Sequence, residues 1–340
     1  MQFYPYPSLK QENDPRARTE AIAADHAAPG VWVATEKVHG SNFSLWISRT
    51  GEIRCGRRNA LLSEGESFYD FEALQRRLEP ALRALAEALA SETTADVEGW
   101  VVFGELYGGI YDHPDVAAIE GLQSVQYGVH YRPDYGFFAF DLATFGAEGL
   151  RFFDCGDGRA HLEAAQIPVL PILFRGSLKE ALAQDDAFIT GVPEALGLPP
   201  RADNICEGIV IRRWAGDPAD PTLRPIFKKK NARFTERVRT DALARKRSRL
   251  SLSTLSPEAQ AVAERLGEYV TEARLHAVLS KELQGAQHNL KRLMGLYTQD
   301  LMKDFAADHR AAMGALDKAD RKQLNVWLSG LIREGIEQWL

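Results

Sequence analysis

The hydrophobic pattern of the first 230 residues is that of a mixed helix and strand region. From Val31 to Ser48, two runs rich in β-branched and aromatic residues flank His39, which predicts two strands with a tight connection between them. Leucines recur at helical spacing over residues 72–90 and predict an amphipathic helix that packs on a sheet. Short runs rich in Val, Ile or Phe and bounded by Gly, Pro or Asp predict further strands at Trp100–Leu106, Phe137–Leu142, Gly208–Arg213 and Arg224–Lys228. The fold class expected for this part is α+β.

After Lys230 the strand-like runs stop and the pattern becomes helical. Ser256-Pro257-Glu258 supplies an N-cap, a proline at the first helical position and an acid in the first turn. Two apolar stripes at helical spacing follow, at Leu290, Leu293, Tyr297 and Leu301 and at Leu324, Trp327, Leu328 and Leu331. Such stripes are typical of helices that pack on one another. We therefore expect an α+β domain at residues 1–235, followed by an all-α domain at residues 236–340.

Composition and charge agree with two globular domains and single out one segment. The chain has 340 residues, more than one core usually organises, and 45% of them are hydrophobic. Its formal charge is -6, yet residues 228–249 hold ten basic and two acidic residues. For a charge run taken alone, a solvated helix at a domain boundary is the simpler interpretation, and contact with nucleic acid is the alternative.

Several classes of protein are disfavoured. The longest nearly apolar stretch, Ile167–Phe174, has eight residues with two prolines and is too short to span a bilayer. The start, MQFYPYPSLK, lacks the features of a secretory signal, so we expect a cytoplasmic protein. The three cysteines, at 55, 155 and 206, form no CxxC pair and indicate neither a disulfide framework nor a zinc site. No GxxxxGK[ST], HExxH or GxGxxG motif is present, and Gly156-Asp157-Gly158 predicts a turn.

Six short segments in a fixed order carry the functional hypothesis. They are TEKVHGSNF at 35–43, CGRRNALL at 55–62, FGELYGG at 103–109, FFAFDL at 137–142, EGIVIR at 207–212 and IFKKKN at 226–231. The first resembles motif I of the covalent nucleotidyltransferases, and the later segments resemble motifs III, IIIa, IV and V of that superfamily. Histidine at 39, where DNA ligases and capping enzymes usually carry aspartate, and the opening Tyr6-Pro7-Ser8-Leu9 resemble the RNA ligase 2 family of ATP-dependent, nick-sealing RNA ligases.

This resemblance covers roughly residues 3–235 and has implications for the fold and the reaction. It implies a nucleotidyltransferase domain of ATP-grasp-like antiparallel sheets with helices, followed by the all-α domain. It also makes Lys37 the nucleophile that attacks the α-phosphorus of ATP, which gives a lysine-AMP and releases pyrophosphate. An ordinary lysine at a strand end is the alternative for Lys37 alone.

The reaction requires Lys37 to be deprotonated when it attacks. A lysine with a reference pKa of about 10.4 is almost wholly protonated at neutral pH, so the site must lower that pKa or stabilise the amine otherwise. Lys228 and Lys230 alternate on a predicted strand, so both point to one face while Lys229 points away. The resemblance places both at the α-phosphate, where their charge disfavours a protonated Lys37.

Acidic residues and one arginine complete the phosphate and ribose side of the predicted site. The motif IV resemblance implies that Glu207 contacts Mg²⁺ or its water, and a solvent-facing acid at a strand edge is the alternative. Glu105 lies in an apolar context, and the resemblance implies that it binds the ATP ribose while Arg58 reaches the sugar or phosphate. Asp141 carries over as a catalytic acid without a derived role, and Arg57 receives none.

The remaining candidates concern the base and the nucleophile loop. The resemblance makes Phe140 and Val210 the faces of an adenine sandwich, with Glu36 at the base edge, and core packing is the alternative for each. His39 and Asn42 lie in the loop after Lys37, where they contact phosphates or orient the reactive end. Local hydrogen bonding within the loop is the alternative for both.

These features together predict an ATP-dependent RNA ligase that repairs nicked or broken RNA through lysine-AMP and an adenylylated 5′ end. The expected cofactors are ATP and Mg²⁺, and the expected partner is RNA, as a nicked duplex or an RNA/DNA hybrid, with no membrane or protein partner. Residues 228–249 can meet phosphates without reading sequence, and the helical domain can clamp the duplex. A DNA or mixed-strand ligase is one alternative, disfavoured because no β-barrel domain is evident after IFKKKN. A nucleic-acid-binding protein that keeps the fold without catalysis is the other alternative. It is disfavoured because the chain retains Lys37, Glu105, Glu207, Lys228 and Lys230.

Overall fold

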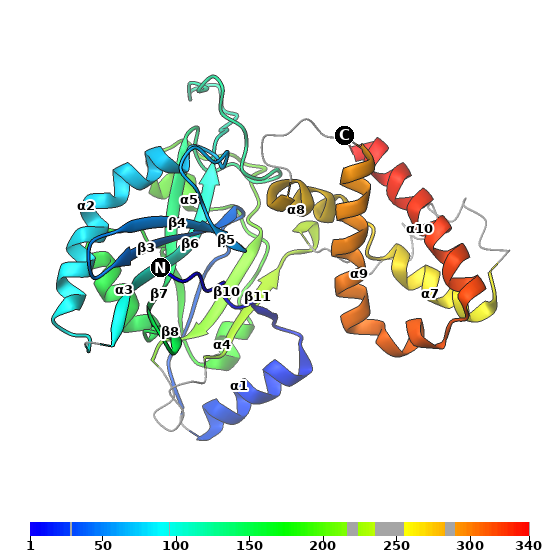
Figure 1. The fold of residues 1–340 in the computed structure, drawn as a ribbon, viewed down its shortest axis with the longest axis horizontal. Helices are drawn as coiled ribbons and strands as arrows, with labels where there is room; N and C mark the ends of the chain where they lie inside the picture. The colour runs from blue at the N-terminus through cyan, green and yellow to red at the C-terminus, as the bar shows by residue number, and fades with distance from the viewer. Residues whose placement is uncertain (28, 95, 216–223, 235–254, 283–289, 340) are drawn as a thin grey trace. The chain divides into compact units, whose positions relative to one another are not determined.

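The computed structural model of the chain describes all residues except 28, 95, 216–223, 235–254, 283–289 and 340. The chain divides into two compact units, Met1–Asn231 and Ala232–Leu340. The first contains two sheets and several helices, whereas the described part of the second is helical, so the expected fold class is confirmed (Figure 1). The domain boundary predicted at residues 235 and 236 lies outside the described residues.

The first sheet has five strands. In spatial order they are β1 (Lys10–Gln11), β11 (Ile226–Lys230), β10 (Gly208–Arg213), β2 (Trp32–Glu36) and β9 (Ile172–Gly176). All neighbours are antiparallel except β1 and β11, which are parallel. One face of this sheet carries Trp32, Ile209 and Ile211, which pack against α1 (Pro15–Ala27) and α4 (Leu178–Leu182).

The second sheet has six antiparallel strands. Their order is β5 (Ala60–Leu61), β4 (Ile53–Arg57), β3 (Ser41–Ser48), β6 (Val97–Gly108), β7 (Tyr135–Gly146) and β8 (Gly149–Phe152). The leucine-rich helix α2 (Phe71–Ala90) covers one face, as its spacing predicts, with Leu74, Leu78, Leu82, Leu85 and Leu89 all buried (Figure 1). On the other face, Tyr6 from the N-terminal segment packs with Trp46, Phe103 and Phe145.

The two strands flanking His39 differ from the simplest expectation. Both exist, but β2 belongs to the first sheet and β3 to the second, so they do not pair with each other. The connection Lys37–Gly40 therefore carries the chain from one sheet to the other. This places the predicted nucleophile at the junction of the two sheets.

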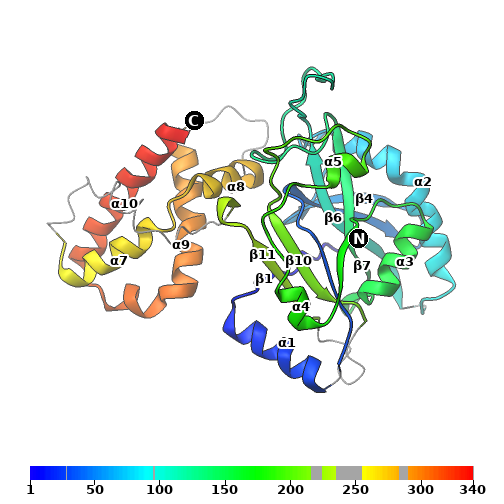
Figure 2. The same cartoon turned by 180° about the vertical axis from the view of Figure 1, so that it is seen from behind.

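The predicted turn at Gly156-Asp157-Gly158 is wrong, because these residues form the first turn of α3 (Cys155–Ala164). The helix packs beside β7, where Leu162 is buried in the core (Figure 2). A Cβ at Gly158 would lie 3.3 Å from Phe153 and 3.4 Å from Leu142, so the glycine lets the helix approach the sheet closely. This packing outweighs the low helix propensity of glycine.

The second unit is described through its helices α7 (Pro257–Gly267), α8 (Glu272–Glu282), α9 (Leu290–Ala315) and α10 (Lys318–Trp339), and a short 3₁₀ turn at Ala232–Phe234. Its core contains Leu293, Tyr297 and Leu301 from one predicted stripe and Leu324, Leu328 and Leu331 from the other. Ser256 caps α7, because its hydroxyl accepts a hydrogen bond from the Ala259 N–H at 3.2 Å. None of the described helices is both long enough and apolar enough to cross a bilayer. The remaining short helix of the first unit is α5 (Val192–Ala195).

Candidate active site

Lys37 opens the four-residue connection between the two sheets. Its backbone N–H donates to the Gly208 carbonyl at 2.8 Å, next to the pairing of β2 with β10. Gly40 closes the connection against β6, where a Cβ would collide with the Leu106 carbonyl oxygen. The connection is therefore fixed to the first sheet at its start and to the second sheet at its end.

Glu207, directly before β10, joins three of the predicted site residues. Its Oε2 accepts a hydrogen bond from Lys37 Nζ at 2.5 Å and lies 3.2 Å from His39 Nδ1, and its Oε1 lies 3.0 Å from Lys230 Nζ. The residue is only 1% exposed. Burial alone would raise the pKa of Glu207, but Lys37, Lys230 and His39 together hold it well below its usual value. The carboxylate is therefore ionised and bound to positively charged or hydrogen-donating groups on several sides.

Glu105 adjoins this cluster from the second sheet. It stands opposite Asn42 in the register of β6 and β3, and its carboxyl accepts a hydrogen bond from the Gly40 N–H. Burial raises the pKa of Glu105 to about 7, against the lowering effect of Lys37, and nearby Glu207 adds to the rise. Arg58 also lowers this pKa from close by, and its Nη2 donates to the Ser8 hydroxyl at 2.8 Å.

The lysines of β11 follow the predicted alternation. Lys230, opposite Gly208 in the register, turns to Glu207, whereas the Nζ of Lys229 donates to the Gln184 carbonyl at 2.6 Å. Lys228 stands opposite Val210. The Glu207 carboxylate pairs with both Lys37 and Lys230 and so links the two lysines.

Glu36 precedes Lys37 but lies in a different environment. It is the register partner of Ile209 and therefore faces the opposite side of the sheet from Val210. Its Oε1 accepts a hydrogen bond from the Thr190 hydroxyl at 2.5 Å. Burial raises the pKa of Glu36 to about 7, although hydrogen bonds from Thr190 and the Gly191 backbone oppose the rise. The structure thus does not join Glu36 to the hydrogen bonds around Glu207.

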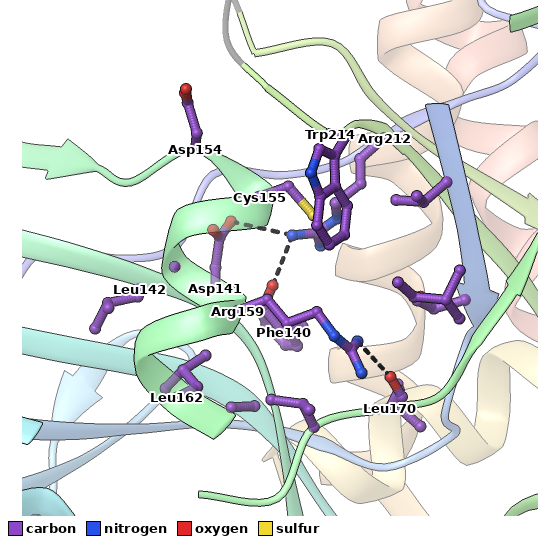
Figure 3. Close-up of a pocket in the computed structure, with 16 residues that line it drawn as sticks. Phe140, Asp141, Leu142, Asp154, Cys155, Arg159, Leu162, Leu170, Arg212 and Trp214 are labelled. Carbon is purple, nitrogen blue, oxygen red and sulfur yellow. Dashed lines mark hydrogen bonds and ion pairs between the residues drawn. The ribbon is translucent and has the colours of Figure 1, made fainter. Parts of the chain in front are cut away.

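The two expected adenine faces lie on different sheets. Phe140 belongs to β7 and lines a pocket that is partly open to solvent (Figure 3). Thr35, the register partner of Val210, lines the same pocket from the first sheet. Phe140 and Val210 are therefore placed on strands that border the space between the sheets, and Phe140 also contacts the Tyr6 ring at 4.9 Å.

The structure places Asp141 in a hydrogen-bond network of its own. Tyr6 donates its hydroxyl hydrogen bond to Asp141 Oδ2 at 2.8 Å, and Arg224 Nη2 lies 2.6 Å from the same oxygen. Arg212 Nη1 lies 3.7 Å from this oxygen and donates to the Phe140 carbonyl at 2.6 Å (Figure 3). Among the described contacts, Asp141 thus joins the N-terminal segment to β10 and does not meet the cluster around Glu207.

Two residues that the sequence analysis missed contact the connection directly. The Tyr131 hydroxyl accepts a hydrogen bond from the His39 N–H at 2.9 Å, and Gln126 Nε2 donates to the Gly40 carbonyl at 3.0 Å. Both belong to the long segment between β6 and β7, which has no periodic pattern to indicate its position. No sequence signal of the kinds considered above would have identified them.

A third omission lies in the helical unit. Arg274 is 1% exposed, its guanidinium pairs with Asp300 and, at 3.0 Å, with Asp304, and its Nε donates to the Tyr269 carbonyl at 3.1 Å. The one available signal was the spacing of two aspartates one helical turn apart within the apolar stripe of α9. In the part of the chain that the structure describes, no three or more His, Cys, Asp or Glu side chains gather as a metal site.

Two family models match this chain. Residues 30–230 match the model described as RNA ligase, and residues 253–334 match the model described as T4 RNA ligase 2 C-terminal. The first match alone covers more than half of the chain and contains Lys37, Glu105, Glu207 and Lys230.

The chain is also similar to individual curated proteins and solved structures. The chain is 28% identical over 356 residues to "RNA-editing ligase 1, mitochondrial" of Trypanosoma brucei brucei, a match that covers 89% of this chain and 75% of the relative. It is 27% identical over 361 residues to "RNA-editing ligase 2, mitochondrial" of the same species, covering 92% and 86%. Solved structures of a Naegleria gruberi RNA ligase with PPi, and of a mutant of it with ATP and Mn, match with a TM-score of 0.42 at 16% and 15% identity. These matches cover 68% of this chain and 57% of the solved chains.

Proposed function

This chain belongs to the RNA ligase family, in its RNA ligase 2 branch, and on that premise we propose that it joins RNA ends with ATP through an AMP carried on Lys37. The family expected from the sequence motifs is thereby confirmed, and with it the expected class of enzyme, an RNA ligase. The observation that carries the proposed mechanism is the cluster in which Lys37, His39 and Lys230 meet the buried carboxylate of Glu207.

The first step is transfer of AMP to the protein. The amine of Lys37 attacks the α-phosphorus of ATP, a P–N bond forms, the bond to pyrophosphate breaks, and the proton of the amine passes to solvent. Glu207 holds Nζ at 2.5 Å and so fixes the position from which the amine approaches the nucleotide. Lys230, and Lys228 two residues before it on the same face of β11, supply positive charge for the phosphate oxygens.

The same proposal assigns the nucleotide contacts. Phe140 and Val210, on the two sheets, sandwich the adenine. Glu36 remains the candidate for the base edge, and to reach it Glu36 would have to leave the Thr190 hydroxyl and turn from the opposite side of the sheet. Glu105 and Arg58 bind the ribose and phosphates, supported by the closeness of Glu105 to both Lys37 and Arg58. Asn42, opposite Glu105 in the register, orients the reactive end.

One residue of this site, Glu207, is suited to bind magnesium. Mg²⁺ is typically held by one or two carboxylates together with substrate phosphates and water, and Glu207 supplies a carboxylate that its partners keep ionised. When bound, the ion neutralises charge on the phosphates of ATP. Glu207 would hold the ion directly or through one of its waters.

The later steps define the nucleic-acid substrate. AMP passes to a 5′-phosphate, and a neighbouring 3′-hydroxyl then displaces it, so both ends must be held together as in a nicked RNA duplex. A DNA or mixed-strand nick is the alternative substrate. Most of the basic segment 228–249 lies outside the described residues. We also propose a cytoplasmic location. The two trypanosomal relatives are named mitochondrial, so cell fractionation should distinguish between the two locations.

Covalent labelling tests the central claim. Wild-type protein incubated with labelled ATP and magnesium is expected to acquire acid-labile AMP, and Lys37→Ala is expected to acquire none. Lys229→Ala is the matched control, because that lysine points to the Gln184 carbonyl on the other face, and it should label like the wild type. Labelled GTP run in parallel should give no label.

Two outcomes decide against the proposal. If the wild type never labels and is not already adenylylated as purified, it is not a covalent nucleotidyltransferase. If Lys37→Ala still binds nicked RNA with salt-dependent affinity while the wild type never seals it, the protein is a nucleic-acid-binding protein. A labelled wild type that seals DNA nicks faster than RNA nicks selects the alternative substrate.

A further inference from the structure

The long segment between β6 and β7 returns to the nucleophile connection and contacts its backbone twice. Tyr131, through its hydroxyl, accepts the His39 N–H at 2.9 Å, and Gln126, through Nε2, donates to the Gly40 carbonyl at 3.0 Å. Tyr131 is 1% exposed and Gln126 is 7% exposed, so little water competes for these bonds. The two side chains therefore satisfy adjacent backbone groups in a protected place.

The connection depends on these contacts because the sheets hold only its two ends. The Lys37 N–H bonds to β10, and the pairing of β3 with β6 starts at Ser41. His39 and Gly40 lie between these two anchors, where the chain passes from one sheet to the other. The side chain of His39, which lies 3.2 Å from Glu207, is thus carried by backbone that Tyr131 and Gln126 hold.

Tyr131 is itself held rigidly. Its ring meets that of Tyr107 edge-on at 5.5 Å, and Tyr107 stacks on Phe138 at 4.9 Å. The preceding residue, His130, exchanges two hydrogen bonds with the Asn204 side chain, one from its N–H at 2.8 Å and one to its carbonyl at 2.6 Å. The Tyr131 hydroxyl is thus fixed by ring packing on one side and by the hydrogen bonds of the preceding residue on the other. A group held in this way can keep the connection in the precise position that a displacement reaction requires.

We propose that Tyr131 and Gln126 are positioning residues for self-adenylylation, which hold His39 and Gly40 so that Lys37 and His39 keep their places on Glu207. The proposal rests on the proposed function, in which Lys37 accepts AMP. Neither residue touches the reacting atoms, so each acts through the connection. Loss of either side chain's hydrogen bond should lower the rate of the chemical step more than it lowers the affinity for ATP.

The test compares two tyrosines of one aromatic cluster. Tyr131→Phe removes the hydroxyl that accepts the His39 N–H, whereas Tyr107→Phe removes a hydroxyl that meets Arg132 and leaves the connection untouched. Single-turnover labelling at saturating ATP should fall by about ten- to a hundredfold in Tyr131→Phe, with the ATP dependence and the melting temperature little changed. Tyr107→Phe should label at the wild-type rate. Gln126→Leu should also slow labelling, and adding it to Tyr131→Phe should cost less than the sum of both effects, because both hold one loop.

The possible results distinguish the positioning role from the proposed function on which it rests. A wild type that acquires no AMP refutes the proposed function itself. A wild type that labels normally, together with Tyr131→Phe and Gln126→Leu variants that label at its rate, overturns the positioning role. A loss of labelling that only matches the loss of folded protein in both variants overturns it as well. If Tyr131→Phe does not fold, folded Gln126→Leu decides alone, and a wild-type rate in it refutes the proposal.

Discussion

Substituting glutamine for Glu36 tests whether burial alone sets the protonation of this carboxyl. Glu36 is 3% exposed, and burial raises its pKa from 4.5 to about 7. A raised carboxyl pKa means that the folded chain binds the proton more tightly than the unfolded chain, so the contribution of Glu36 to stability is greatest below pH 4.5 and is lost as the pH rises through 7. At 1.36 kcal/mol per unit, the full effect is about 3 kcal/mol, of which about 2 to 3 kcal/mol is lost between pH 5 and pH 8.5.

Glutamine cannot ionise, so Glu36→Gln escapes this loss. Urea unfolding of both proteins at pH 5 and pH 8.5 should show the variant gaining about 2 to 3 kcal/mol on the wild type between the two conditions. Any constant packing cost of the amide cancels in this comparison. Glu64→Gln, at an exposed position, is the control and should show no such gain. An equal difference between Glu36→Gln and wild type at both pH values would show that Glu36 is ionised throughout, and the argument from burial would fail.

Three further perturbations follow from other contacts. Glu207→Gln leaves two lysines without their buried carboxylate and should lower the free energy of unfolding by about 3 kcal/mol at pH 7 in urea titrations. Because the pKa of Glu207 is lowered by folding, this deficit should shrink as the pH falls below the usual range of glutamate. Arg274→Met leaves two aspartates without their shared cation and should lower stability by about 3 kcal/mol, measured by thermal unfolding of the full chain. Gly40→Ala forces a Cβ onto the Leu106 carbonyl oxygen and should slow labelling by ATP at least about tenfold, whereas an unchanged rate would show that the connection can move.

The parts of the candidate site that the sequence predicted well are those fixed by local pattern. Lys230 and Lys229 turn to opposite faces because residues alternate along a strand, and the short apolar run around them is enough to identify that strand. Glu207 lies directly before a strand that its apolar run predicts, whereas its contact with Lys37 is seen only in the structure. Local pattern therefore predicts which side chains face a site.

Pairing between strands was not readable in the same way. The apolar alternation on either side of Lys37 is the same whether the two strands pair with each other or with strands of two different sheets. What distinguishes the two arrangements is Gly40, which allows close approach to β6, together with the residues that contact the connection from more than sixty positions away along the chain. Tyr131 and Gln126 went unnoticed for this reason, since a tyrosine and a glutamine in an irregular segment have no pattern that indicates their partners.

For Asp141, the motif resemblance identified the residue but not its contact with Tyr6. The resemblance to RNA ligases carried both the opening Tyr6 and the acid Asp141, but as two separate features. In the structure they form one unit, since the Tyr6 hydroxyl binds Asp141 at 2.8 Å while its ring packs against Phe103 and Phe140. Phe103 and Glu105 lie on the same face of β6, so this unit packs the N-terminal segment onto the face that carries Glu105. Asp141→Asn should therefore reduce labelling by ATP at least as far as Tyr6→Phe does, because it weakens the same hydrogen bond and also the pairing with Arg224 and Arg212. Labelling of Asp141→Asn at the wild-type rate would show that this unit does not support the site.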